Sequence, residues 1–294
     1  MARRGNFDLL GKYAWCVPGG SEIFFLTLML ILGSLLGNFV TLVLVRFMGQ
    51  EMAAEYSMLV SYPIMFIPAM IWAASASRRN RYEHKGLAMD NTHFAPLNWL
   101  SCILIVIAST IAAGIIGDLT NSILPPMPKW LEDAFASLTT GNLLINFICV
   151  SVFAPFFEEW LCRGMVERGM LGHGMKPFWA IVLSALFFAI IHLNPWQAIP
   201  AFLLGCLFGY VYYKTGSLKL TMLMHCTNNT CALILSNIDS LKDFDSWVDV
   251  LGEGYWYCFA AAVLLLALAV LAFRRIKVDS PRGAFEQIPT AFGD

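Results

Sequence analysis

The stretch LLINFICVSVFAPFFEEWLCRG, residues 143–164, joins two features that oppose each other in a membrane. Residues 143–157 carry no charge and are apolar enough to lie in lipid. Glu158, Glu159 and Arg163 follow directly. A charge at the centre of a membrane helix costs about 3 kcal/mol even on lenient insertion scales, so such groups usually face a bundle interior or a wet cavity. The stretch predicts a membrane helix, and its charged residues indicate a candidate functional site.

The composition supports a polytopic membrane protein. Of 294 residues, 58% are hydrophobic and 13% are charged, whereas an average soluble domain is about a quarter charged. The net charge of -1 argues against nucleic acid as the main partner. The eight cysteines form no CxxC pair and lie mostly in apolar runs, where cysteine packs as a small hydrophobic residue, so we assign them no chemistry.

Apolar windows of about 20 residues predict eight transmembrane helices. Their ranges are 23–47, 57–76, 99–117, 143–168, 177–193, 198–213, 217–237 and 255–273. The first range is too long to be a removable signal peptide and has no clear cleavage site after it. The expected fold class is all-α: a polytopic membrane helix bundle that forms one membrane-embedded domain over 1–294. Its core would be 143–237, and a disordered tail would cover 278–294.

The charges of the loops predict the orientation, because Lys and Arg are enriched in short cytoplasmic loops. One set of helix ends is basic, with Arg3, Arg4, Lys12, Arg78, Arg79, Arg81, Lys85, Arg168, Lys176, Lys214, Lys219, Arg274, Arg275, Lys277 and Arg282. The other set has only Arg46, Lys129 and Lys242 among Glu51, Glu55, Asp118, Glu132, Asp133, Asp239, Asp243, Asp245 and Asp249. This alternation fits eight spans with both termini cytoplasmic. Short loops favour a bacterial plasma membrane, and 118–142 and 238–254 are expected to be interfacial connectors with short helices.

The polar residues inside the spans fall at helical spacings. Glu159 and Arg163 are four residues apart, so they share a helix face and can form an ion pair. His225 and Asn229 have the same spacing. Glu158 lies about 100° around the helix from Glu159. We therefore expect Glu158 to remain without a charged partner.

A free carboxylate, two histidines and a carboxamide are the groups needed to hydrolyse an amide. Phe188 lies one turn before the second histidine, His192. Each cluster also has a structural explanation: the Glu–Arg pair as a link between helices, His192 as a capping residue, and His225 with Asn229 as an interhelical hydrogen bond. No serine or cysteine suggests a nucleophile, since Cys226 is adjacent to His225 and faces elsewhere. Convergence on three spans favours an active site.

Three motifs resemble the signatures of the CAAX-prenyl-protease and bacteriocin-processing family of intramembrane proteases. They are EExxxR at 158–163, FxxxH at 188–192 and HxxxN at 225–229, and the resemblance covers about 143–237. It implies a glutamate-dependent peptidase in a bundle of about eight spans. The resemblance assigns Glu158 as the base that activates water, His192 as the residue that holds this water, and His225 with Asn229 as the oxyanion stabilisers. Glu159, Arg163 and Phe188 would support them.

The expected substrate is a hydrophobic, lipidated or leader-type peptide reached from the membrane, with the lipid bilayer as surroundings and no nucleic acid. The oligomeric state stays open. No cofactor is expected. Zinc is the alternative, because two histidines and a glutamate also bind zinc, but Asn229 would then have no role. The alternative functions are a non-catalytic relative, acting in bacteriocin immunity or as a scaffold, and a proton-relay carrier. Carriers usually have two related halves, and no such repeat is evident.

Overall fold

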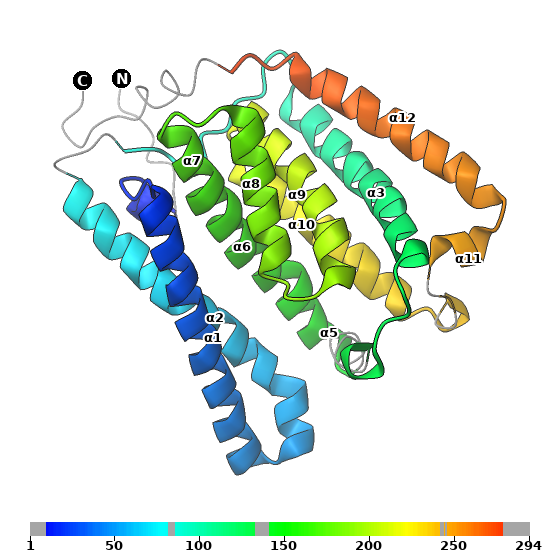
Figure 1. Cartoon of the computed structure of the whole chain (residues 1–294), viewed down its shortest axis with the longest axis horizontal. Helices are drawn as coiled ribbons and strands as arrows, with labels where there is room; N and C mark the ends of the chain where they lie inside the picture. Colours follow the sequence, from blue (N-terminus) through cyan, green and yellow to red (C-terminus); the bar gives the residue numbers. More distant parts are fainter. Residues whose placement is uncertain (1–9, 82–85, 133–140, 242–243, 245, 279–294) are drawn as a thin grey trace.

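A computed structural model describes residues 10–81, 86–132, 141–241, 244 and 246–278 (Figure 1). These residues are helical with connecting turns, and no strand occurs among them. The main helices are α1 Gly20–Met48, α2 Gln50–Asn80, α3 Trp99–Ile123, α5–α7 within Leu143–Gly172, α8 Pro177–Ile190, α9 Pro195–Thr215, α10 Leu218–Ser236 and α12 Gly254–Arg274. The predicted all-α membrane bundle is confirmed.

Every predicted span coincides with a helix, but not every helix is long and apolar enough to cross a membrane by itself. Among the described residues, five reach this criterion: α1, α2, Trp99–Thr120 of α3, Leu143–Gly172 and α12. Helix α8 is apolar but shorter. The remaining helices, α9 and α10, carry more polar side chains and lie within the bundle. The number of eight membrane crossings therefore stays a prediction.

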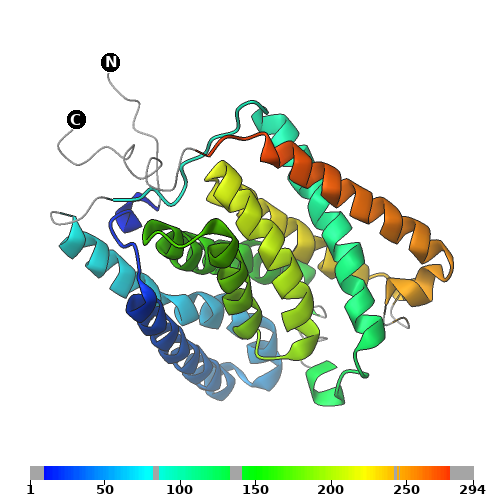
Figure 2. The same cartoon turned by 45° about the horizontal axis from the view of Figure 1, so that its top comes forward.

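The helices run up and down between two faces of the molecule (Figure 1). The α1–α2 hairpin flanks one side of the bundle, and α3 with α12 flanks the other; Figure 2 shows the same order from a second direction. Between them lie Leu143–Gly172, α8, α9 and α10. These central helices carry all three motifs, so the fold brings the predicted site into the interior of the bundle.

The helix with the two glutamates is not a regular α-helix. It consists of α5 Leu143–Asn146, the π-helix η2 Phe147–Phe153, α6 Ala154–Glu159, the π-helix η3 Trp160–Glu167 and α7 Arg168–Gly172. Pro155 has no N–H to donate within the helix, which favours a locally irregular hydrogen-bond pattern. π-Helical turns are rare and occur frequently at functional sites. Both glutamates lie in the short α-helical part between the two wide segments.

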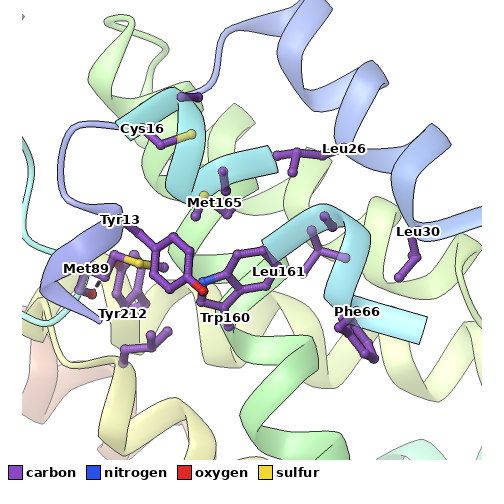
Figure 3. Packing of buried hydrophobic residues seen from close by; sticks show 14 residues of the cluster. Tyr13, Cys16, Leu26, Leu30, Phe66, Met89, Trp160, Leu161, Met165 and Tyr212 are labelled. Carbon is purple, nitrogen blue, oxygen red and sulfur yellow. Dashed lines mark hydrogen bonds between the residues drawn. The ribbon is translucent and has the colours of Figure 1, made fainter. Parts of the chain in front are cut away.

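Buried apolar side chains near the start of η3 pack against the segment before α1 (Figure 3). Trp160 is fully buried, and its ring meets that of Tyr13 edge to face at a centroid distance of 5.3 Å. Leu161 and Met165 belong to the same cluster. The chain before α1 is thus part of the packed structure and closes one end of the central helices.

Arg168 corrects one prediction. It was expected among the cytoplasmic loop charges, but the helix continues through it to Gly172 and only 3% of it is exposed. Its guanidinium donates hydrogen bonds to the carbonyl oxygens of Gly164, Leu87 and Cys16. Backbone acceptors therefore satisfy this buried cation and tie two distant segments to the helix. Arg168 does not count toward the positive charge of a loop.

A Gly-x-x-x-Gly pattern brings α1 and α2 together. The backbone of Met65 lies against Gly33, and a Cβ atom at Gly37 would be 2.9 Å from the carbonyl oxygen of Ser61. Glycines at this spacing let membrane helices approach closely. The contact holds α1 against the part of α2 that carries Tyr62, next to Ser61.

The two connectors contain short helices, as predicted. Helix α3 extends to Ile123, residues 129–132 are helical, and 133–140 lie outside the described part. The second connector has a 3-10 turn, η4 Asp239–Leu241, and α11 Trp247–Leu251. The predicted tail lies outside the described residues except for residue 278, and so do Arg3 and Arg4.

Candidate active site

Glu159 and Arg163 form the predicted ion pair. Both side chains are fully buried, and Nη1 of Arg163 lies 2.8 Å from Oε1 of Glu159. Nη2 of Arg163 donates to the carbonyl oxygen of Gly205 at 2.9 Å. The guanidinium also lies over the rings of Phe188 and Phe208, at 4.8 and 5.3 Å from their centroids. The pair neutralises the two charges and connects η3 with α8 and α9.

His225 faces both glutamates through its two ring nitrogens. Its Nδ1 lies 3.1 Å from Oε1 of Glu159, and its Nε2 lies 3.8 Å from Oε2 of Glu158. A carboxylate paired with arginine accepts hydrogen bonds only, so Nδ1 donates to Glu159. Nε2 is then the nitrogen that can exchange a proton. The two glutamates point about 100° apart, yet one imidazole connects them.

Glu158 has a partner that the sequence did not predict. The hydroxyl of Tyr62 on α2 donates a hydrogen bond to Oε1 of Glu158. The tyrosine hydroxyl carries no charge, so this contact does not contradict the expectation that Glu158 lacks a charged partner. The other oxygen, Oε2, is buried and accepts no hydrogen bond from the described residues. This oxygen is the one left to take a proton.

The sequence gives only part of the information needed to identify Tyr62 as a site residue. It lies in the apolar run SYPIMFIP, 61–68, and a tyrosine within a membrane helix usually finds a polar partner for its hydroxyl. Nothing in the sequence indicates which helix supplies this partner. The contact spans 96 residues and depends on the packing of α2 against α6.

His192 follows the end of α8 and is held in one orientation. Its Nδ1 lies 2.7 Å from the carbonyl oxygen of Phe188, which can only accept, so Nδ1 carries the proton. Nε2 is left with a lone pair. The rings of Phe188 and His192 meet edge to face at 4.9 Å. The contact between Nδ1 and Phe188 satisfies a carbonyl group in the last turn of α8, so His192 also acts as the capping residue of its structural alternative. The N-cap of α9 is Asn194, which accepts from the backbone N–H of Gln197.

Asn229 is oriented by the π-helix opposite it. Its Nδ2 donates to the carbonyl oxygen of Val150 in η2 at 2.8 Å. Its Oδ1 accepts from Nδ2 of Asn228 at 3.1 Å. The second N–H of Asn229 has no partner assigned by these contacts. Asn228 was not among the predicted site residues, and its adjacency to Asn229 in the sequence is the only signal that pointed to it.

A cavity of about 750 Å³ adjoins this network. Four predicted residues line it: His192, His225, Asn229 and the supporting residue Phe188. Asn228 also lines it. Neither Glu158 nor Glu159 is among the residues that line the cavity. His225, which lines it, contacts both carboxylates. The structure thus brings the predicted residues into one region but places the two carboxylates behind the imidazole.

Another buried carboxyl group lies near the network. Glu167 is fully buried in η3, and neither of its oxygens has a hydrogen-bond partner among the described residues. A Cβ atom at Gly209 would be 2.7 Å from its Oε2. The spacing of Glu167 from Arg163 places it on the far side of the arginine from Glu159. Glu167 is not among the site residues that the motifs predict.

The metal alternative has no preformed ligand cluster in the described part of the chain, where no group of three or more His, Cys, Asp and Glu residues suits an ion. His225 uses Nδ1 for Glu159, and His192 uses Nδ1 for a backbone carbonyl. A zinc ion would therefore need Nε2 of both histidines together with a third ligand. Measurement of bound metal is the test of this alternative.

Comparison with known families places these residues in context. The family model described as type II CAAX prenyl endopeptidase Rce1-like matches residues 140–231. No curated protein and no solved structure matches the chain. The match contains all three motifs and ends two residues after Asn229. Residues 140–231 are therefore similar to the Rce1-like CAAX prenyl endopeptidase family, and the resemblance that the three motifs predicted is confirmed over this range.

Proposed function

We propose that the chain is an intramembrane endopeptidase in which Glu158 activates the attacking water. The observation that carries the proposal is the state of the Glu158 carboxylate: Tyr62 donates to Oε1, while Oε2 is buried, has no hydrogen-bond partner among the described residues and lies 3.8 Å from Nε2 of His225. A general base needs a free lone pair within reach of its water. The match to an endopeptidase family supports the same reaction class.

In the proposed reaction, Oε2 of Glu158 takes a proton from a water molecule while the oxygen of that water forms a bond to the peptide carbonyl carbon. His192 accepts a hydrogen bond from the same water through Nε2. The negative charge that develops on the carbonyl oxygen is stabilised by the free N–H of Asn229 and by Nε2–H of His225 in its protonated form. When the C–N bond breaks, Glu158 returns its proton to the leaving nitrogen.

The supporting residues keep this arrangement in place. The ion pair of Glu159 with Arg163 leaves Glu159 ionised, and the carboxylate then orients His225 through Nδ1. Phe188 contacts both imidazoles edge to face, at centroid distances of 4.9 Å from His192 and 5.5 Å from His225. Preorganised donors of this kind commonly contribute several kcal/mol to catalysis.

The test is incubation of the purified protein with a library of hydrophobic and prenylated peptides, read by mass spectrometry. Glu158→Gln should abolish cleavage, because the amide cannot accept a proton, and should leave the fold intact, because its volume is nearly unchanged. Glu51→Gln is the matched control: Glu51 is exposed in the first turn of α2, and its loss should leave the rate unchanged.

Two outcomes would contradict the proposal. If Glu158→Gln keeps most of the wild-type rate, this residue is not the base. If no peptide is cleaved and a cellular phenotype of the protein survives Glu158→Gln, the chain acts without catalysis, as an immunity factor or a scaffold.

A further inference from the structure

The two faces of the bundle carry opposite charge. Among the described residues, the basic face, where both described chain ends lie, has Lys12, Arg78, Arg79, Arg81, Lys176, Lys214, Lys219, Arg274, Arg275 and Lys277, with Glu22 and Asp90 as acidic residues. The acidic face, at the other ends of the helices, has Glu51, Glu55, Asp118, Glu132, Asp239, Asp249 and Glu253, with Arg46 and Lys129. The positive-inside rule places the basic face in the cytoplasm.

The cavity lies toward the acidic face. Its wall is formed by the last turns of α3, the first half of α9, the second half of α10, α11 and the start of α12. All these segments lie at the end of the bundle away from the described chain ends (Figure 1). His225 and Phe208 form its inner end, and both lie near the middle of their helices.

The rim of the cavity is formed by α11. The backbone N–H of Trp247 donates to Oδ2 of Asp118 at 2.6 Å, which fastens α11 to α3. Trp247, Val250 and Leu251 line the cavity, so its outer part is mainly apolar. Asp249 and Glu253 are exposed beside this rim. An apolar peptide segment fits such an opening, whereas a strongly acidic one would be repelled.

We propose that the cavity opens on the non-cytoplasmic side of the membrane and takes an apolar peptide segment presented there. The part of this inference that concerns the peptide substrate rests on the proposed peptidase function. A peptide that is confined to the cytoplasmic leaflet would meet the end of the bundle where Tyr13, Trp160 and Arg168 are buried among the described residues, whereas the cavity extends toward the opposite end. The substrate is then the outer part of a membrane segment or of an exported peptide.

The first experiment determines on which side of the membrane the acidic face lies, and it does not depend on peptidase activity. Single cysteines replace Glu253 and Lys176 in a full-length, cysteine-free background; both positions are exposed. A membrane-impermeant maleimide is added to right-side-out and to inverted plasma-membrane vesicles. Glu253→Cys should be labelled in right-side-out vesicles only, and Lys176→Cys in inverted vesicles only. Asp249→Cys and Lys277→Cys are a second pair in case a variant of the first does not accumulate.

The second arm measures delivery of substrate. The probe is an apolar peptide with a quencher and a sulfonated dye, which cannot cross the bilayer. We expect cleavage in right-side-out vesicles, none in inverted vesicles, and none in either for Glu158→Gln.

The outcomes separate the two proposals. Labelling of Glu253→Cys in inverted vesicles, or cleavage in inverted vesicles only, would overturn the inference about the side and leave the peptidase intact. Labelling of Glu253→Cys in right-side-out vesicles, with no cleavage even by detergent-solubilised protein, would support the proposed non-cytoplasmic opening. It would contradict the proposed peptidase function. Outer labelling with cleavage from both sides would overturn the claim that substrate enters only there.

Discussion

The hydroxyl of Tyr62 donates a hydrogen bond to Oε1 of Glu158 and joins α2 to the helix that carries the EExxxR motif. The contact fixes the carboxylate so that its other oxygen is free. Tyr62 lies outside the matched range 140–231. The proposed catalytic base is thus positioned by a part of the chain that the family model does not cover.

Tyr62→Phe should lower kcat by about 10-fold or more with little change in KM, since a hydrogen bond to a charged acceptor contributes about 1.5–3 kcal/mol. The measurement is steady-state kinetics beside thermal unfolding. Tyr212→Phe is the control, because it removes a buried hydroxyl that donates to the carbonyl oxygen of Met89, away from the glutamates. Equal losses of kcat in both variants would mean that Tyr62 acts only on stability.

Arg163→Ala should destabilise the protein by about 3–5 kcal/mol, because it leaves the buried Glu159 carboxylate without its partner. Thermal unfolding in detergent measures the loss. The double variant Glu159→Gln with Arg163→Met removes both charges and should regain part of the stability without regaining activity, since His225 loses its ionised acceptor. An Arg163→Ala protein that is inactive but as stable as the wild type would indicate that the arginine contacts substrate.

Gly37→Ala should separate α1 from α2, because the new Cβ atom would lie 2.9 Å from the carbonyl oxygen of Ser61. Overpacking of this kind costs about 1–3 kcal/mol, and a shift of α2 would also move Tyr62 and reduce the rate. Gly20→Ala is the matched control in the first turn of α1, where no heavy atom lies within 4 Å of the new Cβ position. Similar stability and activity in the two variants would argue against this helix contact.

Burial raises the pKa of the Cys16 thiol to about 11. The thiolate is the reactive form, so a variant that retains only Cys16 should react slowly with maleimide near neutral pH. Its rate should rise as the pH approaches the raised pKa. Unfolding in SDS should abolish the protection. Fast labelling of the native protein near neutral pH would show that the segment before α1 does not pack against η3.

Removal of metal should leave the activity unchanged under the proposed glutamate mechanism. The measurements are the rate after exhaustive treatment with several chelators and the metal content of the purified protein. Stoichiometric zinc, with activity lost on its removal and restored when zinc is added, would replace the glutamate mechanism by a metal-dependent one.

Helical periodicity explains how much of the site the sequence predicts. Residues four apart share one face of a helix whatever surrounds it, so the Glu159–Arg163 pair and the placing of Phe188 before His192 follow from spacing alone. Apolar length likewise predicts the helices, because a membrane helix must satisfy its backbone hydrogen bonds internally.

Contacts between helices are the part that only the tertiary structure decided. Tyr62 reaches Glu158, Val150 orients Asn229, and both glutamates meet one imidazole because of how α2, α10 and the π-helical segments pack. The position of Arg168 at the end of an apolar run predicts an exposed loop residue. In the structure its guanidinium is buried and donates to carbonyl groups of distant segments. Composition and spacing are local properties, whereas the partner of a buried polar group depends on which helix lies opposite, and packing sets this choice.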